Sequence, residues 1–294
     1  MHAMKVAIAI FFGTFATAGI AAEFPIEPKM VLIAGGTYPM GAVARSASVR
    51  PPHKVTLAPF KIDAFEVTNA QFATFLNTLK ITIKRDTRAG ELSSQDVAGP
   101  DADRVWGGSR GTARVFIEMD DRDAGIETAN GRFVPSPGAA NRPVSESTWR
   151  GAVEFCKWRH ARLPSEAEWE ATARGKQGRT YPWGEAPPTP ERAVFAARAT
   201  RPVGSLPAGA TPQGVFDMAG NVAEWTSSLL KPYPYDAKDG REDLTVNAER
   251  VTRGGDYTYD VAPEQLTGYF RDGFSRNPVQ GHRHIGIRCA RDAG

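Results

Sequence analysis

The chain of 294 residues lacks a concentrated basic stripe, a long apolar segment and an internal repeat. Lys and Arg number 36 against 33 Asp and Glu, so electrostatic binding of nucleic acid is not expected. The apolar run Val6–Phe15 is too short to cross a bilayer as a helix, which takes about 20 residues. With 41% hydrophobic and 23% charged residues, the composition also excludes a disordered tail protein, a collagen and a multi-span membrane protein.

The first residues have the parts of a secretory signal peptide. Lys5 precedes the apolar run Val6–Phe15, and mostly small residues follow at 16–22, as in an exported precursor. We expect residues 1–22 to be the signal peptide and residues 23–294 to be a single periplasmic domain. No cysteine follows the exit of the signal, so no lipid or other membrane anchor is expected. A buried N-terminal helix or an uncleaved anchor is the alternative.

Cysteine is scarce, with only Cys156 and Cys289 in the whole chain. In an oxidising compartment an even pair indicates a disulfide first. The chain-entropy model gives a bridge across so long a loop about 5 kcal/mol of stabilisation. Two free buried thiols, or one reactive thiol, are the alternatives, and nothing local supplies the base that a reactive thiol needs.

Glycine and proline are abundant, with 29 and 22 residues, which predicts a loop-rich fold with short strands and few helices. Two capping boxes, Thr68 with Gln71 and Ser165 with Glu168, each predict the start of a helix. A further helix is expected over 148–160. Strands are expected within 30–40, 51–65, 250–255 and 285–290.

Five segments in order resemble the formylglycine-generating enzyme (sulfatase-modifying factor) family. They are MVLIAGGTYPMG (30–41), FEVTNAQFATFLN (65–77), RPVSESTWRGAVEFCKWRHARLPSEAEWEATARG (142–175), YPWG (181–184) with GNVAEW (220–225), and RGGDY (253–257) with IGIRCAR (285–291). The resemblance implies one α+β domain, a variant of the C-type-lectin fold with little regular secondary structure. It also implies that Cys156 and Cys289 correspond to a pair that forms a structural disulfide in several members.

The chain departs from the family where the family does its chemistry. Members resemble one another in an RGGS-x-x-C-x-x-x-x-C stretch, whose two cysteines bind copper and drive oxygen chemistry. Here Asp256 replaces the serine, and Tyr259 and Glu264 replace the two cysteines. Without these thiols, copper binding has no basis. We therefore expect no copper and no formylglycine-generating activity.

One branch of the family fits better than the others. The sulfoxide synthases carry an additional iron-binding domain for which this chain has no room, and the gliding-motility branch is usually lipidated. An exported branch without the catalytic cysteines, needed for pyoverdine siderophore maturation, resembles this chain in size, signal peptide, disulfide pair and acidic residue at position 264. The resemblance implies an oxidoreductase that converts dihydropyoverdine to pyoverdine, with an electron acceptor that the sequence does not identify.

The segment Asp256–Arg271 is the expected site. A carboxylate there can act as general base in a dehydrogenation, while tyrosines and an arginine can hold a planar aromatic ligand. We expect catalytic roles for Glu264, Tyr259 and Asp256, and substrate binding by Tyr257, Tyr269 and Arg271. The alternative is that Glu264 is a solvated loop residue and the tyrosines anchor the core or the loops.

Two metal hypotheses arise. The resemblance implies structural calcium at positions that correspond to Asp217, Gly220, Val222 and Glu224, and hard oxygen ligands suit that ion. The alternative is that both carboxylates form hydrogen bonds without metal. His282 and His284 would share one strand face, as half of a metal site or as an exposed strand edge.

A second class of function stays open. No flavin, nicotinamide or haem motif is recognisable in the sequence. The chain could therefore be a non-catalytic binding or scaffold module, whose lectin-like pocket holds a peptide or another periplasmic maturation enzyme.

Overall fold

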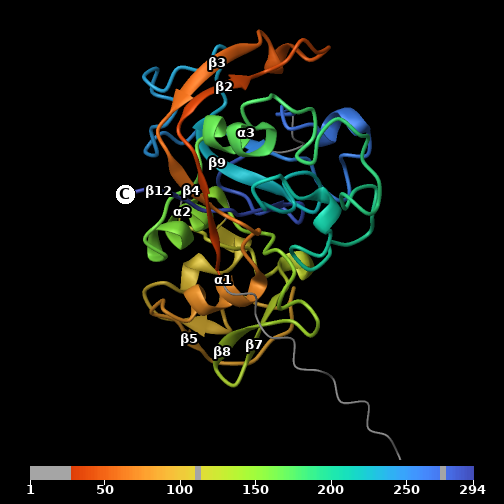
Figure 1. Ribbon diagram of the computed structural model, residues 1–294. Helices are drawn as coiled ribbons and strands as arrows, with labels where there is room; N and C mark the ends of the chain where they lie inside the picture. The colour runs from red at the N-terminus through yellow and green to blue at the C-terminus, as the bar shows by residue number, and fades with distance from the viewer. Residues whose placement is uncertain (1–27, 110–113, 272–275) are drawn as a thin grey trace, which may run out of the picture.

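Strand β4 (Phe60–Asp63) joins the two ends of the described chain. The computed structural model describes residues 28–109, 114–271 and 276–294, so the expected signal peptide at 1–22 lies outside the described residues. Strand β1 (Met30–Ile33) pairs antiparallel with one edge of β4, and β12 (Ala290–Asp292) pairs antiparallel with the other. Segments from opposite ends of the sequence thus form one three-stranded sheet (Figure 1).

A second three-stranded sheet is built around β9 (Ala223–Leu229). Strand β10 (Arg250–Arg253) pairs antiparallel with it and β11 (Ile285–Gly286) pairs parallel. The single strand expected over 285–290 is therefore wrong. It is divided between β11 and β12, which belong to different sheets, because the residues between them cross from one sheet to the other.

The three α-helices of the described residues are short and begin at capped positions. Helices α1 (Asn69–Leu76) and α3 (Glu166–Arg174) begin with the two expected capping boxes, in which the Thr68 and Ser165 hydroxyls accept backbone N–H groups three residues on. Helix α2 (Trp149–Trp158) begins after Thr148, as expected. None of the helices in the described part of the chain has the length and apolar character needed to cross a membrane.

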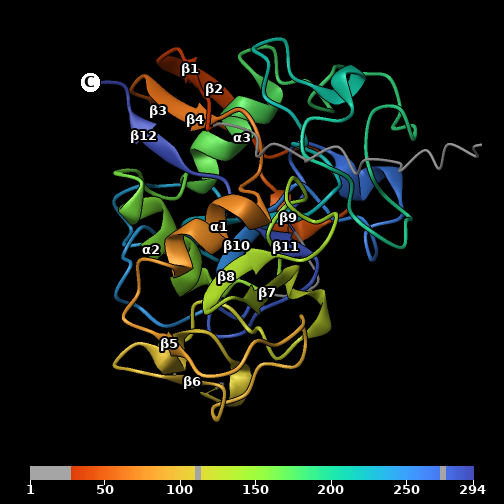
Figure 2. The same ribbon diagram turned by 90° about the horizontal axis from the view of Figure 1, so that it is seen from below.

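The remaining strands form two-stranded ribbons at the two ends of the molecule. Strands β2 and β3 form one end, while β5, β7 and β8 lie near the other (Figure 1), and Figure 2 shows β5 and β6 together. The pairs are β2 (Gly36–Met40) with β3 (His53–Leu57), β5 (Thr82–Ile83) with β6 (Val97–Ala98), and β7 (Ile126–Ala129) with β8 (Arg132–Pro135). The expected α+β fold with little regular secondary structure is confirmed.

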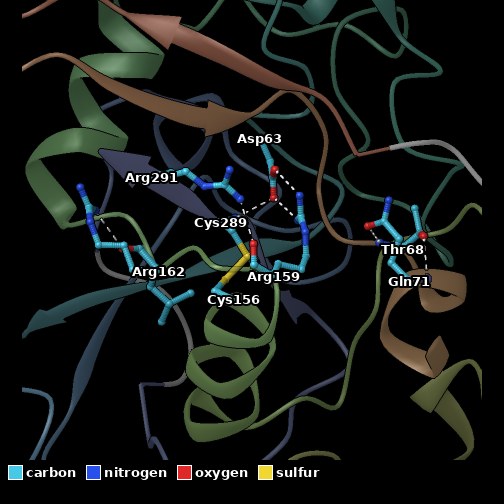
Figure 3. Close-up of a disulfide and its surroundings, with 9 residues drawn as sticks. Asp63, Thr68, Gln71, Cys156, Arg159, Arg162, Cys289 and Arg291 are labelled. Carbon is cyan, nitrogen blue, oxygen red and sulfur yellow. Dashed lines mark hydrogen bonds and ion pairs between the residues drawn. A yellow bond between two sulfur atoms is a disulfide. The ribbon is translucent and has the colours of Figure 1, made fainter. Parts of the chain in front are cut away.

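The expected disulfide between Cys156 and Cys289 is present, and its Cα atoms lie 5.6 Å apart. It joins α2 to the crossing segment between β11 and β12. The Asp63 carboxylate accepts two N–H groups of Arg159 at 2.7 and 3.0 Å and the Cys289 N–H at 3.0 Å (Figure 3). The covalent bond and these charged contacts together fix α2 against β4 and the C-terminal strand.

Candidate functional site

A tight turn after β10 carries Tyr259. Gly255 has φ +68°, and a Cβ atom there would lie 2.5 Å from the Gln265 carbonyl oxygen, so this close approach requires glycine. Oδ1 of the fully buried Asp256 then accepts the N–H groups of Thr258 at 2.6 Å and Tyr259 at 2.7 Å. These bonds close the turn and leave the Tyr259 side chain 40% exposed.

Asp256 and Asp260 form a buried pair of carboxyl groups beneath this turn. Oδ2 of Asp260 accepts the Asp256 N–H at 3.1 Å, and Oδ1 accepts the Gln265 Nε2–H at 2.7 Å. Burial, then the charge of Asp256, raises the pKa of Asp260 to about 7. Burial also raises the pKa of Asp256. The pair therefore holds a proton near neutral pH, and it supports the turn from below.

The exposed Tyr259 ring lines a cavity of about 300 Å³, which we call the Tyr259 pocket. The pocket is strongly polar, and its walls come from segments far apart in the sequence. The other lining residues are Glu118, Asp121, Glu146, Gln280, Gly281, His282, Arg283 and His284. Of the six residues expected to act in catalysis or substrate binding, Tyr259 is the one that lines this pocket.

Two uncharged imidazoles stand beside the Tyr259 ring. The ring of His284 meets that of Tyr259 edge to face at 4.9 Å, and the His282 and His284 rings lie 5.5 Å apart. Burial lowers the pKa of both histidines to about 4, with a further contribution at His282 from His284 and at His284 from Arg283. At neutral pH both rings are therefore uncharged, and an uncharged ring nitrogen can accept a proton.

An acidic group, which we call the acidic wall, adjoins the histidine rings and lines the pocket through Asp121 and Glu146. Carboxylate oxygens of Asp121, Asp123 and Glu146 lie within 4.8 Å of one another, the spacing of a group that could hold a cation. Arg283 already supplies positive charge here, since its Nη1 lies 3.6 Å from Asp123 and its Nη2 donates to the Tyr259 hydroxyl at 3.3 Å. Charge of both signs thus meets in one small pocket.

Close backbone contacts join the three segments of the pocket that carry Glu118, Glu146 and His282. Glu146 has φ +58°, a conformation that costs free energy in a residue other than glycine. Its carbonyl accepts the Glu118 N–H at 3.0 Å, and its N–H donates to the His282 carbonyl at 3.1 Å. A Cβ atom at Gly281 would lie 2.2 Å from the Glu146 oxygen, so only glycine permits this approach.

The structure does not bring Glu264 to the Tyr259 pocket. Glu264 lies exposed in the 3₁₀ turn Pro263–Leu266 and is not among the pocket residues. A general base needs to lie within hydrogen-bond reach of its substrate. The turn directs this side chain to solvent, so the structure does not bring the expected base to this pocket.

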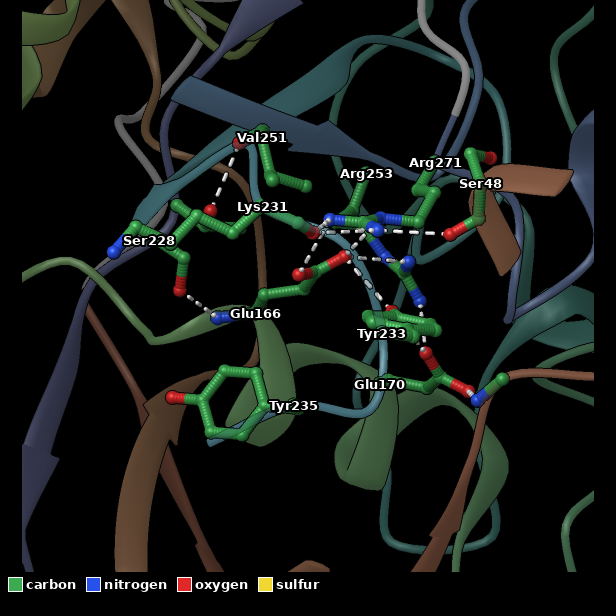
Figure 4. Close-up of polar contacts among 12 residues, drawn as sticks. Ser48, Glu166, Glu170, Ser228, Lys231, Tyr233, Tyr235, Val251, Arg253 and Arg271 are labelled. Carbon is green, nitrogen blue, oxygen red and sulfur yellow. Dashed lines mark hydrogen bonds and ion pairs between the residues drawn. The ribbon is translucent and has the colours of Figure 1, made fainter. Parts of the chain in front are cut away.

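Arg271 belongs to a buried ion network (Figure 4), whereas the half-buried Tyr269 side chain lies against Arg174, whose guanidinium is 5.3 Å from the tyrosine ring centroid, and only its carbonyl touches the network. Arg271 Nε lies 2.8 Å from a Glu166 oxygen, and the guanidinium stacks 4.2 Å from the Tyr233 ring centroid. Arg253 donates to Glu170 at 2.6 Å and to the Tyr269 carbonyl at 3.4 Å. These bonds hold Arg271 in the interior, and it does not line the Tyr259 pocket.

Tyr257 is likewise an interior residue. Its side chain is 7% exposed and packs with Val194 and Leu206. Burial raises its pKa to about 12. Tyr257 thus anchors the core, as the alternative interpretation of the tyrosines predicts. Tyr259 is exposed and does not follow that interpretation.

The expected calcium ligands do not fit a cation. Arg288 donates to both oxygens of Glu224, at 2.6 and 3.0 Å to Oε1 and at 2.9 Å to Oε2, and Trp169 Nε1 donates at 2.7 Å. Asp217 instead accepts the Gly204 N–H at 2.6 Å, and burial raises its pKa to about 6. The N–H of Val222 donates to Glu66. Gly220 stands at a turn with φ +75°. The Glu224 charge that calcium would need is neutralised by Arg288.

Sequence reasoning missed most of the Tyr259 pocket. His282 and His284 were expected on a strand, either as half of a metal site or as an exposed edge, but they lie before β11 and His284 is 3% exposed. Glu118 and Asp121 come from the polar, Gly-rich stretch between α1 and α2, the least readable part of the sequence, where the strand-like piece at 115–119 does not form a strand. Glu146 lies inside a family segment to which the resemblance assigns no role.

The chain is similar to known proteins along almost its whole length. The family described as "Sulfatase-modifying factor enzyme 1-like domain" matches residues 16–293. The formylglycine-generating enzyme of Streptomyces coelicolor is 33% identical over 293 residues, which cover 90% of this chain and 89% of that protein. The serine/threonine-protein kinase Pkn1 of Chlamydia trachomatis is 32% identical, but the match spans 91% of this chain and only 39% of the kinase.

A solved structure shares the fold. The structure of PvdO from Pseudomonas aeruginosa has a TM-score of 0.61 at 23% sequence identity, and the match covers 92% of this chain and 100% of that one. Identity at this level shows the architecture alone. It agrees with the expected fold, in which short strands and long loops surround three small helices.

Proposed function

The chain belongs to the formylglycine-generating enzyme family of sulfatase-modifying factors, and from this premise we propose that it catalyses an oxidative maturation step in the Tyr259 pocket. The observation that carries the proposal is a phenol ring beside two uncharged imidazoles and an acidic wall. Function depends on the site rather than on the fold. Because both cysteines are joined in a disulfide, the side chains supply proton transfer and hydrogen bonding instead of thiolate chemistry.

The lining favours a substrate that carries phenolic hydroxyl groups. Imidazole nitrogens and carboxylate oxygens accept hydrogen bonds, so they suit a ligand that is rich in O–H donors. The Tyr259 ring is 40% exposed and can pack against a planar aromatic ring. Arg283 lies 5.5 Å from the centroid of the same ring and can stabilise an oxyanion. A catechol-type aromatic ring meets all three features.

The proposed reaction is a dehydrogenation with dioxygen as acceptor. The substrate loses two electrons and two protons, and dioxygen takes up both pairs as hydrogen peroxide. His282, less buried than His284, takes the first phenolic proton, because the resulting phenolate gives up electrons more readily than the phenol. The anion that forms beside the ring stabilises the imidazolium and offsets the burial that lowers the histidine pKa.

A siderophore precursor is the substrate that we favour, and the specific step is oxidation of dihydropyoverdine to pyoverdine in the periplasm. Two arguments support it. The sequence resembles the exported family branch that lacks the catalytic cysteines, and the acceptor-rich lining suits a dihydroxylated quinoline. The proposal requires the N-terminal segment to act as a signal peptide, and it leaves room for other maturation enzymes as partners.

A non-catalytic binding module is the second candidate, and one observation favours it. Glu264, which stands where the family has its second catalytic cysteine, is exposed and does not line the pocket. If neither cysteine position supplies chemistry, the pocket could hold a ligand without transforming it. Binding and turnover therefore need to be measured separately.

The test uses the mature protein and a chemically reduced dihydropyoverdine. Oxygen uptake and the rise of pyoverdine fluorescence report turnover, while calorimetry under nitrogen reports binding. His282→Gln keeps the side-chain volume but removes the base, and should lower kcat by about 10²- to 10⁴-fold. His160→Gln is the matched control, since His160 is exposed at the end of α2.

The outcomes separate the two candidates. Turnover by the wild type that His282→Gln removes and His160→Gln retains supports the enzyme. Binding without turnover supports the module. If the wild type neither binds nor oxidises the substrate, the siderophore assignment fails, and a panel of simple catechols then tests the coarser proposal of phenol oxidation.

A further inference from the structure

A second, larger cavity of about 680 Å³ shares no lining residue with the Tyr259 pocket. It is formed by β3, the C-terminal half of α2 with the turn that follows, the start of α3, and the loop 235–244. Cavities of this size hold drug-sized ligands, typically within about 300–1,000 Å³. Nothing in the chemistry proposed above uses this cavity.

The walls of the cavity are aliphatic. The single aromatic lining residue is Tyr235, and its ring face is covered by the Arg241 guanidinium at 4.6 Å while its hydroxyl donates to Glu242 at 2.7 Å. One face of its single aromatic ring is thus taken by Arg241, and the aliphatic lining suits an alkyl chain. The apolar lining residues are Val55, Leu57, Val153, Ala161, Leu163, Ala237 and Leu244.

Most of the charged groups in the lining are already bonded. Both guanidinium Nη atoms of Arg162 donate to Glu168 at 2.7 Å, and Glu242 accepts the hydroxyls of Tyr235, Ser227 and Ser228. These contacts satisfy the groups without a ligand.

Unlike these bonded groups, the lining residues Lys54 and Lys157 carry charges without a partner among the described residues. They reach the cavity from β3 and from α2, both are exposed, and neither ammonium group forms an ion pair or hydrogen bond with a described residue. One further charge, the exposed Asp236 carboxylate, accepts the Lys238 N–H at 2.9 Å. The lining thus combines an aliphatic interior with two unpaired positive charges and one exposed carboxylate, so an anionic head group has to lie on the lysine side.

We propose that this cavity binds an amphipathic anion, a medium-chain alkyl carboxylate, with its chain against the aliphatic walls and its head group beside Lys54 and Lys157. Charge complementarity selects the head group, and the aliphatic lining selects the chain. Each further methylene that enters the cavity should strengthen binding by about fourfold, which corresponds to about 0.8 kcal/mol.

The test is calorimetry of the mature protein with octanoate, decanoate and dodecanoate below their micelle concentrations. Affinity should rise with chain length by the stated factor per methylene. The double variant Lys54→Gln/Lys157→Gln should weaken decanoate binding by roughly tenfold, as the loss of two exposed charge contacts predicts, and should leave binding of 1-decanol unchanged. Lys84→Gln is the matched control, since Lys84 is exposed and lies outside the cavity.

Two further variants test the cavity itself. Val153→Phe fills it, and Leu244→Asp places a negative charge at a lining residue that is 41% exposed, so at least one of them should fold normally. Both should abolish decanoate binding while leaving the Tyr259 pocket intact. The proposal is overturned if no alkyl carboxylate binds at millimolar concentration, or if the double lysine variant binds as the wild type does. It is also overturned if sedimentation shows a dimer that Leu244→Asp dissociates, since a second copy would then occupy the surface.

Discussion

Arg288 covers both carboxylate oxygens of Glu224, with its Nη2 2.6 Å from Oε1 and its Nε 2.9 Å from Oε2, and neither side chain is exposed to solvent. The pair joins β9 to the segment that crosses between the two three-stranded sheets. Three more groups extend it, since Arg288 also donates to the carbonyls of Asp63 and Phe216 and Trp169 donates to Glu224. The centre of the fold is thus held by charge-assisted hydrogen bonds.

Glu224→Gln should destabilise the protein strongly. The substitution leaves the buried Arg288 guanidinium without a counter-charge, and breaking such a pair typically costs about 3–5 kcal/mol. Chemical denaturation measures the loss. Because Arg288 already neutralises this carboxylate, Glu224→Gln should leave any calcium dependence of the melting temperature unchanged. A calcium-dependent rise in the wild type that Glu224→Gln abolishes would instead support the metal hypothesis.

The parts of the fold that local chemistry specifies were predictable. Capping boxes at Thr68 and Ser165 are formed within four residues, so the sequence alone indicates where α1 and α3 begin. The division of the last strand depends on which sheets accept residues 285–286 and 290–292, and this is decided by tertiary contacts. The same holds for Arg271, whose partner Glu166 lies far away in the sequence.

The sequence singled out Tyr259, His282 and His284 but did not indicate that they share one pocket. Its other walls come from segments that meet because the Glu146 backbone takes a left-handed conformation and Gly281 allows a close approach. Neither feature has a periodic or spacing signal in the sequence. Family resemblance directed attention to the turn after β10, and the alternative of a solvated loop residue describes the exposed Glu264.

Removing the disulfide should cost about 2–5 kcal/mol of the free energy of unfolding. The double variant Cys156→Ala/Cys289→Ala tests this, and the wild type under reducing conditions is its control. The Asp63–Arg159 contact remains in both, so the folded structure should persist at low temperature. Two alkylatable thiols in native protein isolated from the periplasm would contradict the pairing.

Asp260 should make the folded protein less stable as the pH rises. Its pKa is raised to about 7 in the folded state, above the value near 3.9 of an unfolded aspartate. The folded state therefore binds more protons between these values, and stability falls as pH rises from about 4 to about 7. Asp260→Asn should remove this contribution and flatten the dependence relative to the wild type.

Asp217 also has a raised pKa, of about 6, and it adds to the slope in the same direction. The informative quantity is therefore the difference between Asp260→Asn and the wild type at each pH. Asp236→Asn, at an exposed aspartate, is the control and should leave the slope unchanged. A slope that Asp260→Asn does not alter would show that the carboxyl pair with Asp256 does not hold the proton.

The last prediction places the chemistry at the pocket rather than at position 264. Glu264→Gln removes a charge from an exposed turn, so kcat and KM for the phenolic substrate should stay within about twofold of the wild type, as for surface substitutions in general. Tyr259→Phe removes the hydroxyl that accepts the Arg283 N–H at 3.3 Å. The loss of one hydrogen bond, about 0.5–1.5 kcal/mol, should raise KM by roughly two- to tenfold while kcat changes little, because the ring and its contact with His284 remain. Steady-state kinetics at matched protein stability measure both variants. A Glu264→Gln variant that folds normally but loses turnover would return the general base to the second cysteine position, and it would show that the loop approaches the pocket when substrate binds.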